Sequence, residues 1–213
     1  MKPEVSILIP SLRPGQLKWC IEAIINAGDC EVAEIVVVSP FVPPKYATID
    51  IVHVEELQKK GVVNAVTQAY NKAKGDFVIS LSDEVRVYEG WLKLLDEVKK
   101  DWTLIGDFVV EPPNPFSYWG IKFSPFPLIS KKRADFLGGL LDQRYRAFYS
   151  DPDLSLRNYV EGGKVVMRND CRIYHPYIQD DIQNKNVNEY FSKDREAFIQ
   201  KWEPTFGAFP GDP

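Results

Sequence analysis

Short apolar runs alternate with amphipathic stretches along the first half of the chain. Four runs are rich in β-branched residues, which is typical of buried strands, and they lie at residues 5–9, 34–38, 49–54 and 76–81. Between them, apolar side chains recur at helical spacing over residues 17–27 and 62–74. This alternation predicts βαβ units, and therefore an α/β fold whose mostly parallel sheet is covered by helices on both faces.

The second half of the chain is less regular. Between residues 111 and 127 a long stretch is dense in proline and aromatic residues, Pro115 and Phe116 among them, and predicts a loop. Loops of this length are usually functional, and its aromatic side chains suit a carbohydrate or other acceptor better than single-stranded nucleic acid. Elsewhere we expect helices at 91–100, from Ser130, from Asp151 and at 189–202, strands at 104–110, 164–167 and 172–174, and a loose or surface-packed tail at 203–213.

Composition narrows the class of protein. A chain of 213 residues suits one domain, and 45% hydrophobic with 26% charged residues is ordinary for a globular protein. The net charge of -4 argues against a nucleic-acid partner, whose phosphates need a basic surface. No run approaches the roughly 20 apolar residues of a membrane span, and the three cysteines show no CxxC spacing. We therefore expect a cytoplasmic protein.

Polar residues follow the predicted parallel strands at the points where the strands end. These positions are Pro10-Ser11, Ser39-Pro40 and Ser82-Asp83-Glu84, and they meet at the carboxyl edge of such a sheet, where ligands bind. The adjacent carboxylates of Asp83 and Glu84 repel each other unless a cation compensates, and Mg²⁺ or Mn²⁺ prefers oxygen ligands. Acids are also common in solvated turns, so the spacing alone leaves both interpretations open.

Three further residues carry side chains suited to chemistry. Asp151 and Asp153 flank Pro152 ahead of an apolar-periodic stretch. An aspartate there can cap a helix or act as a general base on a substrate hydroxyl, and the two roles can be divided between the pair. His175 follows a strand-like segment, where a histidine is either a metal ligand or a structural residue.

The sequence lacks the motifs of several enzyme classes. The first strand is not followed by G-x-G-x-x-G, and neither a P-loop nor a G-x-S-x-G elbow occurs, which counts against dinucleotide enzymes, P-loop NTPases and α/β-hydrolases. A nucleotidyltransferase would need a glycine-rich, basic loop after the first strand. Residues 11–15 are only a thin version of that loop.

Taken in order, the motifs resemble those of the family 2 glycosyltransferases of the GT-A fold. That family has a strand ending in Pro-Ser/Thr, a second apolar strand, and a helix ending in A-x-G before a D-x-D-like motif. A Gly-Gly segment, an E-D-x-D-L-x-x-R motif and a strand leading to histidine follow. The corresponding segments here are SILIPSL, EIVVVS, NKAKGDFVISLSDE, FLGGLLD, SDPDLSLRNYVEGGKV and IYHP, and they cover about residues 4–178.

The resemblance implies a single GT-A domain over residues 1–213. Its parts are a nucleotide-sugar-binding half at 1–90, an acceptor and catalytic half at 91–178, and a C-terminal helix and tail at 179–213. The implied activity is transfer of a hexose-like sugar, with inversion, from a nucleoside-diphosphate sugar to a hydroxyl. A UDP-sugar is the expected donor, Mn²⁺ or Mg²⁺ the expected cofactor, and a glycan, lipid-linked or small molecule the expected acceptor.

The same resemblance implies roles for individual residues. Asp151 stands at the place of the catalytic aspartate, which takes the proton of the acceptor hydroxyl. The metal would be bound by Asp83, Glu84 and His175. The nucleotide would be held by Pro10, Ser11, Ser39 and Asp83.

The sequence departs from the family pattern at several positions. Ser39-Pro40-Phe41 replaces Asp-Asp-Gly-Ser, and Val66-Thr67 replaces an Arg-Asn pair, so Asn64, Lys59 or Lys60 would supply polar contacts to the nucleotide. Ser82 and Ser150 stand where acids are usual. These losses keep a second hypothesis open, namely a non-catalytic GT-A-like protein that binds a nucleotide or glycan.

Overall fold

The computed structural model describes residues 2–28, 30–31, 33–113, 117–176 and 178–212. Within these residues an eight-stranded sheet forms the centre of the molecule, in the order β3-β2-β1-β4-β9-β6-β10-β5. All of its strands run parallel except β9 and β5. The strands are β1 (Val5–Pro10), β2 (Ala33–Ser39), β3 (Asp50–Glu55), β4 (Phe77–Ser80), β5 (Arg86–Val87), β6 (Leu104–Glu111), β9 (Leu128–Ser130) and β10 (Lys164–Tyr174).

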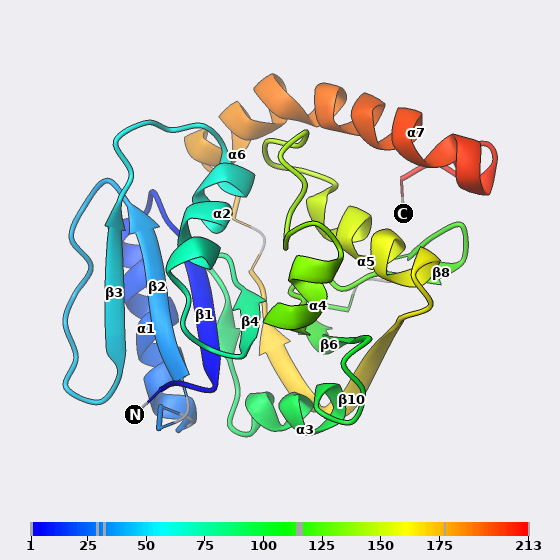
Figure 1. The fold of residues 1–213 in the computed structure, drawn as a ribbon. Helices are drawn as coiled ribbons and strands as arrows, with labels where there is room; N and C mark the ends of the chain where they lie inside the picture. The colour runs from blue at the N-terminus through cyan, green and yellow to red at the C-terminus, as the bar shows by residue number, and fades with distance from the viewer. Residues whose placement is uncertain (1, 29, 32, 114–116, 177, 213) are drawn as a thin grey trace.

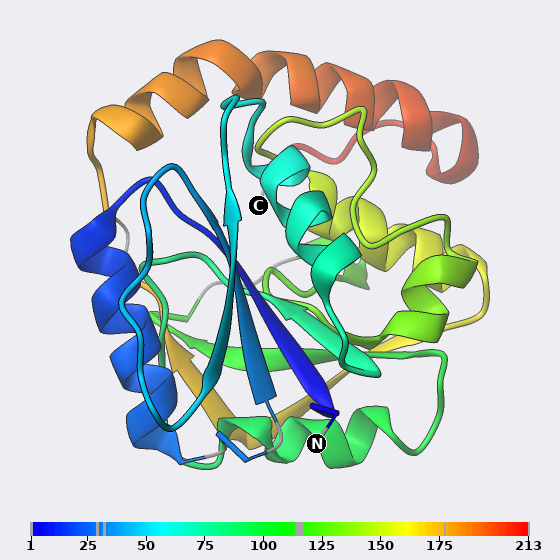
Figure 2. The ribbon, with the colours of Figure 1, turned by 60° about the vertical axis from the view of Figure 1, so that its left-hand side comes forward.

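Helices cover both faces of this sheet, as the alternating pattern predicts (Figures 1 and 2). Alternate residues of β1 point to opposite faces, so Ile7 and Ile9 pack in one core cluster and Leu8 in another. The first cluster includes α1 (Pro14–Ala27), η1 (Trp91–Leu94) and α3 (Leu95–Val98). The second includes α2 (Val62–Lys72), α4 (Lys131–Phe136) and α5 (Ser150–Val160).

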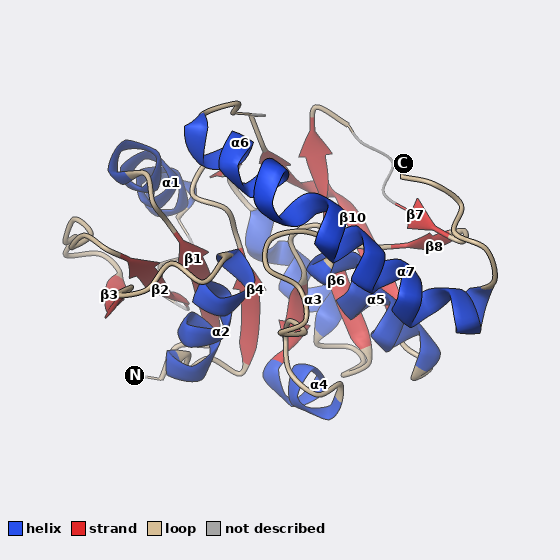
Figure 3. Ribbon diagram, turned by 90° about the horizontal axis from the view of Figure 1, so that it is seen from above, coloured by secondary structure: helices blue, strands red, loops and turns tan. Residues whose placement is uncertain are grey.

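A long helical segment near the C-terminus crosses the carboxyl edge of the sheet, along the top of Figure 1 and in front in the view from above (Figure 3). It consists of α6 (Asp181–Asn186), a π-helical turn η2 (Val187–Phe191) and α7 (Ser192–Phe206). Phe198 and Trp202 of α7 are buried in a third core cluster with Tyr145 and Leu156. The helix expected at 189–202 is therefore confirmed and extends further at both ends.

The aromatic segment at 111–127 is not an open loop. It contains a hairpin of β7 (Ser117–Tyr118) and β8 (Ile121–Lys122). Tyr118 and Phe123 are buried, stack on each other with ring centroids 5.5 Å apart, and belong to the core cluster under α7. These two rings therefore pack under α7, although the sequence predicts that the aromatic side chains of this segment suit an acceptor. Pro115 and Phe116 lie outside the described residues.

Two short strands of the central sheet were not expected from the sequence, in addition to the β7–β8 hairpin. β9 and β5 contain three and two residues, too few for a periodicity of two to be visible. The strands expected at 164–167 and 172–174 are one strand, β10, with a register shift between Met167 and Arg172. Over the described residues, no helix is both long and apolar enough to cross a bilayer.

Candidate active site

A cavity of about 400 Å³ opens at the carboxyl edge of the sheet. Its floor is formed by the residues that follow β1 and β4, and one wall by the segment that leads into α2. The rest of the lining comes from Ala147, Phe148 and the α6–η2 helix, including Ile182 and Tyr190. Parallel α/β sheets bind ligands at this edge, so the cavity occupies the place that the strand pattern indicates.

Asp83 is one of the residues that line the cavity floor. The β1–β4 ladder continues through the bond from the Leu81 amide to the Leu8 carbonyl, which delivers Asp83 to the edge immediately after β4. Its carboxylate accepts hydrogen bonds from Ser11 Oγ at 2.7 Å and from Arg13 Nη1 at 3.1 Å. Burial nevertheless raises the pKa of Asp83, and the Ser11 and Arg13 contacts oppose that shift.

Arg13 joins the cavity floor to the C-terminal helix, a link for which the sequence gives no local signal. Its guanidinium bonds Asp180 in a bidentate manner, from Nε at 2.6 Å and Nη2 at 3.0 Å. Asp180 caps α6 by accepting the Gln183 amide hydrogen bond at 2.8 Å. The Arg13 contact lowers the pKa of Asp180 to about 2. Arg13 therefore holds α6 against the edge where Asp83 lies.

Glu84 and His175 meet at the same edge although 91 residues separate them. His175 follows β10 and lies with Nε2 2.9 Å from Glu84 Oε1. The Phe126 ring contacts the imidazole edge-on at 5.1 Å and helps to fix its orientation. The other carboxylate oxygen, Glu84 Oε2, is buried and has no hydrogen-bond partner in the described part of the chain.

Some of the residues predicted to hold the nucleotide line the cavity, and others do not. Pro10 and Ser11 line the cavity, as Asp83 does. Ser39 is fully buried beside His53 and does not line it, and Asn64 accepts a hydrogen bond from Gln68 Nε2 at 2.9 Å. The nucleotide role of Ser39 and Asn64 stays a prediction, but neither side chain is among those that line the cavity.

Asp151 is the second residue of α5, one turn beyond Phe148 of the cavity wall, and does not itself line the cavity. The helix cap is Tyr149, so Asp151 is not the capping residue. Its surroundings raise the pKa of Asp151 to about 7, because burial disfavours the charged form. A carboxyl group with a pKa near the operating pH is suited to take up a proton.

Asp153 differs sharply from Asp151. It is fully buried, and Oδ1 accepts hydrogen bonds from Tyr145 Oη at 3.1 Å and Trp202 Nε1 at 3.0 Å. Arg157 Nε lies 2.8 Å from Oδ2 and Lys201 Nζ 2.6 Å from Oδ1. These contacts join α5 to α7, so Asp153 is a structural residue.

The cavity wall at 146–148 depends on another buried acid. Asp194 of α7 is 2% exposed and accepts hydrogen bonds from the backbone amides of Arg146, Ala147 and Phe148 at 2.8–3.1 Å. A buried amide that loses its acceptor costs about 1–3 kcal/mol. The Asp194 carboxylate thus fixes the backbone that lines the cavity.

We expect Asp194→Ala to lower the free energy of unfolding by at least about 2 kcal/mol, because three amides lose a charged acceptor together. Urea unfolding would measure this. Glu196→Ala is the control, since Glu196 is exposed on the same helix and its carboxylate accepts a hydrogen bond from Gln200 Nε2 at 3.0 Å. Equal stability of the two variants would show that the 146–148 backbone does not need Asp194.

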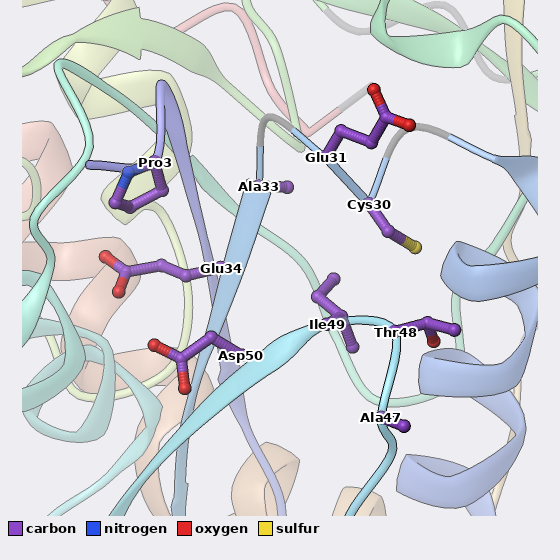
Figure 4. Close-up of a pocket in the computed structure, with 9 residues that line it drawn as sticks. All are labelled: Pro3, Cys30, Glu31, Ala33, Glu34, Ala47, Thr48, Ile49 and Asp50. Atoms are coloured by element: carbon purple, nitrogen blue, oxygen red, sulfur yellow. The ribbon is translucent and has the colours of Figure 1, made fainter. Parts of the chain in front are cut away.

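A second hollow, of about 360 Å³, lies at the opposite, amino end of β2 and β3 (Figure 4). Glu34 and Asp50 project to the same side there. Glu34 is 1% exposed, and its Oε1 accepts bonds from Ser6 Oγ and the Lys74 amide, both at 2.6 Å. Because Glu34 is committed to these partners, we assign it to holding β1, β2 and the end of α2 together.

Comparison with known proteins places the fold. No protein-family model and no curated protein matches the sequence. GalNAc-T7, solved with UDP, GalNAc and Mn²⁺, matches with a TM-score of 0.68 and 16% identity over 92% of this chain and 50% of its own. The mannosyltransferase PcManGT from Pyrobaculum calidifontis was solved with GDP-Man and Mn²⁺. It matches with a TM-score of 0.72 and 13% identity, over 94% of this chain and 65% of its own. S. aureus TarS matches with a TM-score of 0.62 and 10% identity, over 95% of this chain and 44% of its own.

The chain thus spans about half to two thirds of the length of these structures. At such identities the likeness concerns the fold. The chain has the GT-A fold of nucleotide-sugar glycosyltransferases, with one mostly parallel sheet and helices on both faces.

Proposed function

We propose that this chain, with its GT-A fold, transfers a sugar from a nucleoside-diphosphate sugar to an acceptor hydroxyl. The observation that carries the proposal is the meeting of Glu84 and His175 beside the cavity at the carboxyl edge. Donor binding in the cavity would direct its diphosphate toward this pair. The acceptor, a glycan, lipid-linked or small molecule, would approach from the side of Asp151.

Two residues at this end of the cavity offer ligands for a divalent cation, although no group of three potential metal-binding side chains lies together among the described residues. A buried carboxylate oxygen without a partner, as at Glu84 Oε2, is stabilised by a cation. An oxygen and an imidazole nitrogen are both ligands that Mn²⁺ accepts, so Glu84 and His175 would hold Mn²⁺ or Mg²⁺. Each oxygen of the Asp83 carboxylate already accepts one hydrogen bond, from Ser11 or from Arg13, so a cation bound there would share the oxygen with that donor. When bound, the cation offsets negative charge on the departing nucleoside diphosphate.

Asp151 would act as the general base. As the acceptor oxygen forms its bond to the anomeric carbon, the bond from that carbon to the diphosphate breaks, and the hydroxyl proton passes to the Asp151 carboxylate. A single displacement of this kind inverts the configuration. The raised pKa of Asp151, about 7, supports this role, because a carboxyl group that titrates near the operating pH can take up a proton.

Basic side chains at the cavity would favour the donor's diphosphate. Arg13 lines the cavity together with Lys59 and Lys185. Guanidinium and ammonium groups form charge-assisted hydrogen bonds with phosphate oxygens. The chain's overall excess of acids therefore does not oppose an anionic ligand at this edge.

We expect calorimetry to show binding of nucleoside diphosphates that strengthens with Mn²⁺. Glu84→Gln should reduce the Mn²⁺-dependent part at least about tenfold, because an amide is a weaker metal ligand than a carboxylate. Glu89→Gln is the matched control, since Glu89 is an exposed glutamate that follows β5 and does not line the cavity. Binding that ignores Mn²⁺, or survives Glu84→Gln unchanged, would contradict the metal site, and no binding of any donor would refute the function.

One observation favours the rival hypothesis of a binding module without turnover. Asp151 does not line the cavity, and neither do Ser39 and Asn64, so parts of the family's site are not assembled around it. Such a module would bind a nucleotide or glycan with metal present and yet release no free sugar from a donor. Mass spectrometry of donor and acceptor after long incubation separates the two hypotheses.

A further inference from the structure

The cavity has two chemically different ends. In the sheet, β3, β2, β1 and β4 lie side by side, so the ends of β3 and β4 are three strand spacings apart, about 14 Å. Asp83 and Glu84 follow β4, and Glu56 follows β3, and all three line the cavity. That span is comparable to an extended nucleoside diphosphate. With the diphosphate near Glu84, the nucleobase lies at the Glu56 end.

Glu56 is held in place at this end and is not used by the protein itself. Its amide donates to the Ser39 carbonyl at 3.0 Å, which ties it to the end of β2. The residue is 8% exposed and lines the cavity, and among the described residues none donates a hydrogen bond to its carboxylate. Burying a carboxylate that accepts no hydrogen bond costs free energy. A ligand that donates hydrogen bonds to Glu56 would therefore bind more tightly at this end of the cavity.

The surroundings of Glu56 suit a flat ring. Pro10, Val62 and Ala65 line the cavity with apolar surface. Lys59 also lines it and opposes the upward shift that burial causes in the pKa of Glu56. Glu56 is the acidic residue among the described residues of the β3–α2 segment that line the cavity. The sequence lacks the Asp-Asp-Gly-Ser element after β2, but Glu56 offers a carboxylate at the end of β3, the neighbouring strand.

We propose, on the basis of the proposed function, that Glu56 selects the nucleobase and that the preferred donor carries guanine. Guanine presents the N1 and N2 hydrogens side by side, which matches the two oxygens of a carboxylate. Uracil presents a single N3 hydrogen between two carbonyl oxygens. One carboxylate oxygen can accept that hydrogen, but the other then faces a carbonyl oxygen, which repels it. Adenine and cytosine each offer one donor beside a ring nitrogen that accepts. The UDP-sugar implied by the family resemblance is then not the preferred donor.

The experiment compares GDP, UDP, ADP and CDP by calorimetry at pH 8 with Mn²⁺, on the whole chain and on Glu56→Gln. The wild-type chain should bind GDP at least about tenfold tighter than UDP, the size expected for one bidentate pair. Glu56→Gln should lose that preference and bind UDP more tightly than the wild type does, because an amide pairs with N3–H and a neighbouring carbonyl of uracil. Loss of fold alone would not produce this gain.

Glu55→Gln is the matched control, since Glu55 is the exposed neighbour on β3 and does not line the cavity. It should keep the wild-type preference. Equal binding of GDP and UDP by the wild-type chain, or a preference unchanged by Glu56→Gln, would overturn the assignment of Glu56 while leaving the proposed function intact. Binding of none of the four diphosphates would refute both. The wild-type panel decides the base preference even where the variant does not fold.

Discussion

Asp151→Asn is expected to lower the rate of sugar transfer by about 10²–10⁴-fold, the usual contribution of a general base. Asparagine keeps the size of the side chain but cannot take the acceptor proton. Donor binding should remain, since Asp151 does not line the cavity. Single-turnover assays with saturating donor, together with calorimetry on the same variant, would measure the two quantities separately.

The pH dependence follows from the raised pKa of Asp151. The wild-type rate should rise with pH and level off above about 7, where the carboxyl group is ionised and able to accept a proton. The effect on stability has the opposite direction. Between its ordinary value of 3.8 and about 7 the folded state binds the extra proton, so stability falls as pH rises through this window.

Asp151→Asn should therefore raise the free energy of unfolding at pH 8, by on the order of 1–3 kcal/mol, because no buried charge remains. Gain of stability with loss of turnover is the signature of a residue kept for function. Asp50→Asn, at the amino edge of β3, is the control and should change neither quantity. Turnover that survives in Asp151→Asn would remove Asp151 from the mechanism.

Asp153→Ala is expected to lower the free energy of unfolding by about 3–5 kcal/mol, the usual cost of removing one partner of a buried ion pair. Arg157 and Lys201 would lose their shared carboxylate, and Tyr145 and Trp202 an acceptor. Arg157 also donates to the carbonyls of the Gly-Gly segment, for example Gly139 at 2.9 Å, so the loss would spread into the turn after α4.

Chemical denaturation at pH 7 would measure this effect. Asp153→Asn should fall between wild type and Asp153→Ala, since an amide oxygen still accepts from Tyr145 and Trp202 but carries no charge. Asp151→Ala serves as the comparison two residues away. Were Asp153→Ala no less stable than Asp151→Ala, the links from α5 to α7 would not be what holds the C-terminal helix in place.

Local pattern was enough to predict the sheet and its helices. Hydrophobic periodicity depends only on neighbours along the chain, so β1, β2, β3 and β4 and the helices α1 and α2 appear in it directly. Parallel strand ends share one edge, which predicted that Ser11, Ser39, Asp83 and Glu84 lie in one region, and the family resemblance added His175 to it. Elements of two or three residues, β5 and β9, have no period and were missed.

Only the tertiary structure separated the roles of Asp151 and Asp153. Two residues along a helix are about 200° apart around its axis, so one aspartate faces the α7 cations and the other does not. The same holds for the link from Arg13 to Asp180, 167 residues away, and for Glu56, whose burial comes from packing of distant segments. Periodicity determines which side of a strand or helix is apolar, whereas ion pairs, cavities and pKa shifts arise from contacts between segments that the sequence does not place side by side.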